Sequence, residues 1–204
     1  MARIRPFRSE DVEGLYDVCV KTADVGGDAT GMLSDDALWG DLFAVPYALR
    51  DPGLCWVVEA EDGRVIGYVV ATDDTNPFAA WFRDEWWPSR RDRYRPSGAP
   101  EPTAQDRFLA YGDRQAPRDD AIVRDYPAHL HIDLLPETQG QGLGRRLIDT
   151  LLAELGRRGV PALHLSMNAD NAAAGAFYER LGFTQLASGE GSTTYGIRIP
   201  GAQS

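Results

Sequence analysis

The hydrophobic positions of this chain predict a set of strands separated by helices. Two β-rich runs, residues 54–60 and 64–72, flank a short Glu-Asp-Gly turn, and this pattern is typical of a hairpin. Further strands are predicted over residues 2–8, 128–135, 162–168, 184–188 and 193–199. Strands mixed with helices in this way indicate a mixed α/β fold.

Apolar residues recur at helical spacing between these strands. One helix is predicted after Ser9 and another after Ser34, since both serines are candidate N-caps. The longest apolar stripe covers residues 142–158. A last helix is predicted to start at Asn171, a candidate cap, and to stop at Gly182.

Residues 73–127 interrupt the regular pattern. This segment is rich in aromatic and charged residues and in proline, which breaks regular elements. We expect an insertion of short helices and loops rather than a linker, because its large apolar side chains need cover. These side chains are Trp81, Phe82, Trp86 and Trp87.

Composition narrows the class of protein. The chain has 204 residues and a net charge of −10, which argues against a nucleic-acid partner and is compatible with a cationic substrate or with plain solubility. No apolar run approaches bilayer-spanning length and no secretory signal is visible, so we expect no membrane partner and a cytoplasmic location. Cys19 and Cys55 are expected to be reduced core thiols.

The chain is not expected to hold a metal ion. Its histidines, His129, His131 and His164, lack metal-ligand spacing, and solvated or hydrogen-bonded side chains are the favoured interpretation.

The stretch ETQGQGLGRRL, residues 137–147, has glycine at every second position in its centre. A strand, a glycine loop and a helix make an anion site from loop amides and the helix N-terminus. The loop ends in Gly144-Arg145-Arg146, which excludes the GK[ST] of a Walker A loop. Its third glycine comes one residue too early for the dinucleotide fingerprint. The pattern that remains is Gln139-x-x-Gly142-x-Gly144.

That pattern resembles the pyrophosphate loop, Q/R-x-x-G-x-G/A, of the GNAT superfamily of acetyl-CoA-dependent N-acetyltransferases. Downstream, residues 171–183 match the N-x6-Y-E-x-x-G-F signature of the same superfamily. Residues 4–19, 65–78 and 86–98 resemble one branch, the acetyltransferase-like C-terminal domain of O-GlcNAcase and its freestanding bacterial relatives. The eukaryotic domains of that branch look eroded at the glycine loop, whereas QGQGLG is intact here.

The resemblance implies a single GNAT domain over residues 1–204. Its central, mostly antiparallel sheet would be splayed between the fourth and fifth strands and flanked by helices. Residues 73–127 would be an insertion between the third and fourth strands, and residues 128–186 the acetyl-CoA-binding core. The residues implied to bind acetyl-CoA are Ile132, Leu134, Gln139, Gly140, Gln141, Gly142, Leu143, Gly144, Arg145 and Asn171.

Three catalytic candidates follow from the residues and the resemblance. Asp133 lies in an apolar strand, where its pKa could rise towards that of a useful general base, although an Asp paired with an arginine or with His131 is the alternative. Asp170, at the end of the next strand, is the second candidate base. Tyr178 is implied to protonate the departing thiolate, and a core tyrosine is the alternative.

The resulting hypothesis is direct transfer of acetyl from acetyl-CoA to a primary amine in a ternary complex. The acceptor would be a small-molecule amine or a basic peptide, and the protein a monomer or homodimer. Asp73, Asp74, Asn76 and the aromatic cluster Trp81–Trp87 are expected near the acceptor, where they would suit an ammonium group. A packed subdomain is the alternative, and such an aromatic stretch more often forms one. The alternative hypothesis is a catalytically weak acetyl-CoA-binding module that acts as a sensor or interaction domain.

Overall fold

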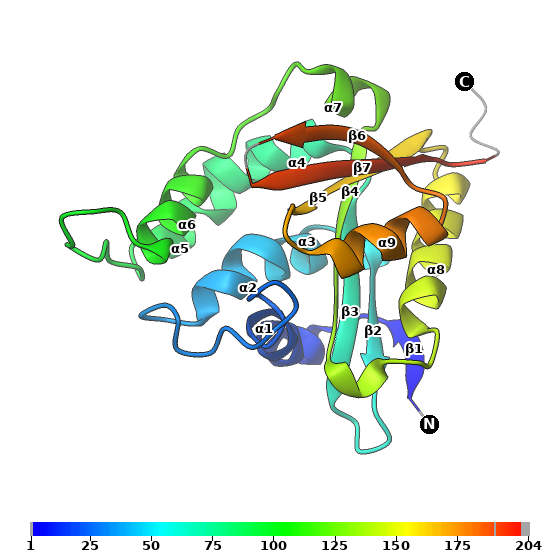
Figure 1. The fold of residues 1–204 in the computed structure, drawn as a ribbon, viewed down its shortest axis with the longest axis horizontal. Coiled ribbons are helices and arrows are strands. Elements are labelled where there is room, and N and C mark those ends of the chain that lie inside the picture. The colour runs from blue at the N-terminus through cyan, green and yellow to red at the C-terminus, as the bar shows by residue number, and fades with distance from the viewer. Residues whose placement is uncertain (1, 190, 201–204) are drawn as a thin grey trace.

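The computed structural model describes residues 2–189 and 191–200, and its centre is a sheet in the order β1-β2-β3-β4-β5-β7-β6 (Figure 1). Neighbouring strands are antiparallel, except that β4 and β5 run parallel. The strands are β1 (Arg3–Pro6), β2 (Cys55–Glu59), β3 (Val65–Thr72), β4 (Ala128–Leu134), β5 (Ala162–Asn168), β6 (Thr184–Gly189) and β7 (Ser192–Arg198). The predicted mixed α/β fold with a mostly antiparallel sheet is confirmed.

Helices connect the strands and cover the sheet. The α-helices are α1 (Val12–Val20), α2 (Ala37–Phe43), α3 (Val45–Arg50), α4 (Thr75–Trp81), α5 (Pro88–Arg91), α6 (Ala104–Asp113), α7 (Ala121–Asp125), α8 (Leu143–Arg157) and α9 (Ala172–Arg180). The 3-10 turns η1 (Ser9–Asp11), η2 (Pro52–Leu54) and η4 (Pro136–Thr138) and the π-helical turn η3 (Phe82–Trp86) join them. None of the described helices is both long and apolar enough to cross a membrane.

The two faces of the sheet are covered by different helices, with α1 to α3 on one side of β3 and α8 on the other (Figure 1). Helix α1 approaches β3 so closely that a Cβ atom on Gly14 would lie 2.6 Å from Cβ of Val65. Every residue of β3 is buried, as a strand covered on both faces requires. The free thiols of Cys19 and Cys55 lie in this core, as expected.

Both predicted serine caps are wrong, because neither serine is the N-cap residue, and near each site an aspartate accepts a hydrogen bond from a backbone amide. Ser9 lies inside η1, where the carboxylate of Asp11 accepts a hydrogen bond from the amide of Arg8 at 2.8 Å. Ser34 precedes α2, and the carboxylate of Asp35 instead accepts from the first amide of that helix at 2.9 Å. A carboxylate accepts a stronger hydrogen bond from a backbone amide than a hydroxyl does.

The segment 73–127 packs against the body of the protein, as predicted for an insertion rather than a linker. Trp86 and Trp87 are buried, and the indole nitrogen of Trp86 donates to the carbonyl oxygen of Asp41 in α2 at 2.9 Å. Tyr94 donates its hydroxyl proton to the carboxylate of the same aspartate at 2.5 Å. The single domain over residues 1–204 stays a prediction, and residues 1, 190 and 201–204 lie outside the described residues.

Candidate active site

The sheet opens between β4 and β5. Strand β4 pairs with β3 from His129 to Leu134, whereas it pairs with β5 at only two positions, Ala128 with Leu163 and His129 with His164. The amide of Leu135 donates to the carbonyl oxygen of Ile66, on the β3 side, at 3.0 Å. Because backbone groups alternate along a strand, those of Ile132 and Leu134 face the gap. The structure thus confirms the predicted splay.

The glycine loop lies at the end of β4 and continues into α8. Gly140 and Gly142 have φ angles of +74° and +66°, a region that side chains other than glycine adopt with difficulty. Gly142 is the N-cap residue of α8 and offers no side chain to cap it. Within the described residues, the amides from Gln141 to Arg145 have no hydrogen-bond acceptor. They are therefore free donors at the positive end of a helix dipole.

Gly144 is needed for close packing, and its φ angle is not in the positive range of Gly140 and Gly142. A Cβ atom at this position would lie 3.1 Å from Phe177 and 3.2 Å from Leu134, tighter than ordinary contacts. It therefore lets α8 approach β4 and α9 together. The side chain of Arg145, one residue on, donates to the carbonyl oxygen of Arg180 at the end of α9 at 3.0 Å.

The other residues of the predicted loop take structural roles beside these amides. The amide of Gln139 donates to the carbonyl oxygen of Pro136 at 3.1 Å. The side-chain amide of Gln141 donates to the backbone carbonyl oxygen of Glu137 at 2.8 Å. Leu143 is buried in the core. These contacts hold the loop in shape without occupying the free amides.

Asn171 caps α9, as predicted. Its side-chain oxygen accepts a hydrogen bond from the amide of Ala174 at 3.0 Å. The contact uses Oδ1 alone, so the cap is compatible with the second implied role of Asn171, binding the CoA arm.

Asp133 is hydrogen-bonded to a tyrosine, and not to an arginine or to His131, which was the alternative interpretation of this residue. The hydroxyl of Tyr68, which lies opposite Asp133 on β3, donates to its carboxylate. Burial raises the pKa of Asp133, while hydrogen bonds from Tyr68 and Thr22 oppose the shift. A carboxyl group with a raised pKa can gain and lose a proton closer to neutral pH.

Asp170 has a different environment. It lies exposed in the turn between β5 and α9, where its amide donates to the side-chain oxygen of Asn168 at 2.9 Å. Its carbonyl oxygen accepts from the amide of Ala172 at 3.0 Å. The two candidate bases thus differ in position: Asp133 lies within β4 beside the gap, whereas Asp170 lies in an exposed turn.

Tyr178 belongs to an aromatic cluster next to the gap. It is 7% exposed, and its ring centroid lies 5.3 Å from Phe177, 5.5 Å from Phe183 and 6.1 Å from Tyr195. Burial raises the pKa of its hydroxyl, and the charge of Asp133 adds to the shift. No hydrogen-bond partner of this hydroxyl occurs in the described part of the chain. The residue is therefore a core side chain whose hydroxyl has no hydrogen-bond partner among the described residues.

A pocket of about 550 Å³ adjoins the gap on the side of α2, α3, α4 and α6. Its lining includes Phe43, Tyr47, Phe78, His129, His131 and His164. The histidines are hydrogen-bonded, as the sequence predicted, but their gathering in one pocket was not predicted. The sequence contains one signal for this gathering, the position of the three histidines on the neighbouring strands β4 and β5. The other walls of the pocket come from segments that are distant in the chain. No group of His, Cys, Asp and Glu side chains among the described residues could hold a metal ion.

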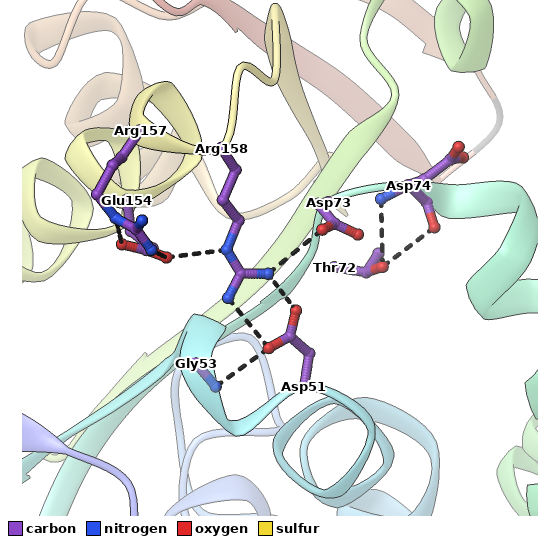
Figure 2. Close-up of polar contacts among 8 residues, drawn as sticks. All are labelled: Asp51, Gly53, Thr72, Asp73, Asp74, Glu154, Arg157 and Arg158. Carbon is purple, nitrogen blue, oxygen red and sulfur yellow. Dashed lines mark hydrogen bonds and ion pairs between the residues drawn. The ribbon is translucent and has the colours of Figure 1, made fainter.

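The acidic residues predicted near the acceptor lie in structural contacts instead (Figure 2). Arg158, just after α8, forms ion pairs with Asp73 at 3.3 Å and with Glu154 at 2.9 Å, and a further one with Asp51. Asp74 accepts a hydrogen bond from the amide of Asn76 at 3.1 Å and so caps α4. Neither Asp73 nor Asp74 lines the pocket.

Comparison with known proteins gives a consistent result. The model of a family described as "Acetyltransferase (GNAT) family" matches residues 32–183. Protein O-GlcNAcase of Rattus norvegicus is 24% identical over 192 residues, which are 92% of this chain and 20% of that protein. The [ribosomal protein bS18]-alanine N-acetyltransferase of Salmonella typhimurium is 42% identical over 83 residues, 41% of this chain and 52% of that protein. The chain thus spans a fifth to about half of these relatives.

Solved structures share the fold. The crystal structure of SsHAT superposes with a TM-score of 0.90 and 39% identity, covering 97% of this chain and 98% of that one. The yncA structure from Salmonella typhimurium, a putative acetyltransferase solved with its cofactor acetyl-CoA, has a TM-score of 0.56 and 18% identity. It covers 97% of this chain and 94% of that one, and at this identity it shows the fold alone.

Proposed function

The chain belongs to the acetyltransferase (GNAT) family, and from that premise we propose that it transfers acetyl from acetyl-CoA directly to a primary amine. The observation that carries the proposal is the free amides of the intact glycine loop, at the mouth of the gap between β4 and β5. Side chains suited to proton transfer, Asp133 and Tyr178, favour this proposal over a weak binding module without catalysis.

The cofactor would lie along the gap. The amides from Gln141 to Arg145 and the N-terminus of α8 suit the pyrophosphate, because they are unpaired donors with a favourable dipole. The backbone groups of Ile132 and Leu134 suit the pantetheine arm and the acetyl carbonyl, since they face the gap without a strand to pair with. Asn171 would contact the CoA arm.

The side chains beside the gap suit the proton transfers. Asp133 would take the proton of the attacking amine as the new C–N bond forms, and a β4 amide would donate to the carbonyl oxygen as negative charge develops there. Tyr178 would give its proton to the thiolate as the C–S bond breaks. Asp170 is the alternative base, and its exposure to solvent makes it the weaker candidate.

The pocket favours a small-molecule amine over a basic peptide. Its lining contains Arg114 and Arg118 and aromatic rings, and none of the described side chains that line it is a carboxylate. Positive charge at its wall would repel an acceptor with several cationic groups. The acceptor would therefore carry its amine on an apolar or anionic body.

Release of free thiol tests the function. The protein would be incubated with acetyl-CoA and a panel of primary amines: 2-phenylethylamine, free amino acids, a diamine and a peptide with N-terminal alanine. We expect amine-dependent thiol release, strongest for amines without a second positive charge. Acetyl-CoA binding without thiol release for any amine would contradict the proposal and favour the sensor or interaction module.

A further inference from the structure

A chain of hydrogen bonds runs from β4 into the wall of the pocket. The hydroxyl of Tyr47 in α3 lies 2.8 Å from Nε2 of His129 and 3.2 Å from Nε2 of His131. The other ring nitrogen of His129, Nδ1, lies 2.7 Å from the hydroxyl of Thr75. That hydroxyl lies 2.7 Å from the carbonyl oxygen of Pro127. The chain thus links five groups in a fixed order.

The end of this chain at Pro127 determines where each proton lies. A carbonyl oxygen can only accept, so Thr75 must give its single hydroxyl proton to Pro127, or two oxygen lone pairs would face each other at 2.7 Å. Thr75 can then only accept from Nδ1 of His129. Burial keeps the pKa of His129 well below its usual value, so this ring is neutral at pH 7 and its Nε2 has no proton.

The same logic fixes His131. Since Nε2 of His129 has no proton, Tyr47 donates its hydroxyl proton to it and can only accept from His131. His131 must therefore carry its proton on Nε2. Burial lowers the pKa of His131 to about 4, so at pH 7 its Nδ1 is an unprotonated acceptor. Within residues 2–189 and 191–200, nothing donates to this nitrogen.

We propose that Nδ1 of His131 accepts a hydrogen bond from the acceptor amine and so aligns its lone pair for attack on the acetyl carbonyl. Tyr47, His129 and Thr75 are positioning residues that hold His131 in the required tautomer. The proposal rests on the proposed function and names a residue that binds the acceptor.

The location of His131 supports this role. It lines the pocket and is half-buried there. It lies two residues before Asp133 on the same face of β4, a separation of about 7 Å along a strand. An amine bound to His131 would thus lie between the pocket and the candidate base. The charged and titratable groups around it are Arg114, Arg118, Tyr111 and His164 from the pocket walls, with Tyr47, His129 and Asp133.

The tautomer can be measured without a substrate. The chain has only three histidines, so a long-range 1H–15N correlation spectrum of the labelled full-length protein at pH 7 can be assigned with His129→Gln and His131→Gln. We expect His129 to be protonated on Nδ1 and His131 on Nε2. In Tyr47→Phe, His131 should lose this preference and populate both tautomers. Protonation of His131 on Nδ1 in the wild type would overturn the inference.

Kinetics then test the contact with the acceptor, using the amine that gives the fastest thiol release. Gln in place of His131 keeps an N–H group near the position of Nε2 but lacks the bare ring nitrogen. We expect its KM for the amine to rise roughly 10-fold, with the KM for acetyl-CoA unchanged. Asn places an amide oxygen near the position of Nδ1, so His131→Asn should raise the amine KM less.

The outcomes separate the two proposals. An unchanged amine KM in His131→Gln, or a larger increase in His131→Asn, would overturn the role of His131 while leaving the transferase function intact. If wild-type protein released no thiol with any amine, both would fail. A retained increase in melting temperature with acetyl-CoA would show that each variant is folded.

Discussion

The two sides of the gap between β4 and β5 present different chemical groups. On one side, the glycine loop presents backbone amides, and its side chains only shape the turn. On the other side, the pocket presents side chains, with His131 and Tyr47 in a hydrogen-bonded chain and aromatic rings around them. The difference follows from the ligands proposed for each side. A pyrophosphate needs many unpaired donors, whereas alignment of an amine needs one acceptor in a defined protonation state.

The largest expected effect is the loss of acetyl-CoA binding after a substitution in the glycine loop. In Gly142→Val, a side chain would occupy the space of the pyrophosphate, so we expect the increase in melting temperature with acetyl-CoA to disappear. Gly142 has a φ of +66°, so valine also strains the backbone there. Gly63, with a φ of +87° and open space around it, is a matched control in the β2–β3 turn.

Gly63→Val separates the effect of backbone strain on stability from the loss of acetyl-CoA binding. Gly63→Val should lower the melting temperature of the free protein by a similar amount yet keep the full increase with acetyl-CoA. Equal increases in wild type and Gly142→Val would show that the loop does not hold the cofactor.

The next effect concerns the base. Asp133→Asn removes basicity at nearly constant volume, so kcat/KM should fall by roughly 10²–10⁴-fold. Burial raises the pKa of Asp133, and a base works only when deprotonated. The wild-type rate should therefore fall with decreasing pH at a higher pH than for an ordinary aspartate, and the variant should lose this acidic limb.

Asp170→Asn is the matched comparison, because Asp170 is exposed and lies in the turn between β5 and α9. It should keep both the rate and the acidic limb. Loss of the limb in Asp170→Asn alone would make Asp170 the base, and retention in both variants would exclude both aspartates.

A smaller effect is expected at Tyr178. Tyr178→Phe should keep acetyl-CoA affinity within a few-fold and lower kcat by roughly 10²-fold, as for loss of a general acid. Tyr195, in the same aromatic cluster, donates its hydroxyl to Glu179 at 3.4 Å and provides the control. If Tyr178→Phe and Tyr195→Phe had the same kcat as wild type, Tyr178 would be a core residue only.

The smallest effect tests how the C-terminal end of α8 is anchored to the segments that follow α3 and β3 (Figure 2). The side chain of Arg158 is 24% exposed and contacts Asp51, Asp73 and Glu154, whereas that of Arg157 is 72% exposed and contacts only Glu154. In urea unfolding, Arg158→Met should lower the free energy of unfolding by about 1–3 kcal/mol. Arg157→Met should change it by less than about 0.5 kcal/mol. Equal effects would exclude an anchoring network.

The strand, glycine loop and helix that form the backbone side could be predicted from the sequence because their residues are contiguous. Glycine spacing encodes the positive φ of Gly140 and Gly142, and the helix pattern after it places the dipole. The cap at Asn171 could be predicted as well, because the side chain bonds an amide only three residues further along the chain. The strands and helices were predictable for the same reason, since strand alternation and helical stripes are short-range patterns. The mostly antiparallel sheet and its splay were predicted from the resemblance to the GNAT superfamily.

The pocket side could not be predicted because its parts are distant in the chain. Tyr47, Thr75 and His131 meet only once α3, α4 and β4 have packed together. The partner of Asp133 was missed similarly, since only the β3–β4 register brings Tyr68 opposite it. The contact between Asp73 and Arg158 was not predicted, because Arg158 lies 85 residues further along the chain.

Transfer of a labelled acetyl group tests the central claim most directly. The protein, acetyl-CoA labelled with carbon-13 in its acetyl group and the best amine of the panel would be mixed in a single turnover. We expect the label to appear in the N-acetylated amine as fast as thiol is released, with none bound covalently to the protein. Label that stays in acetyl-CoA with every amine, although acetyl-CoA binds, would contradict the account.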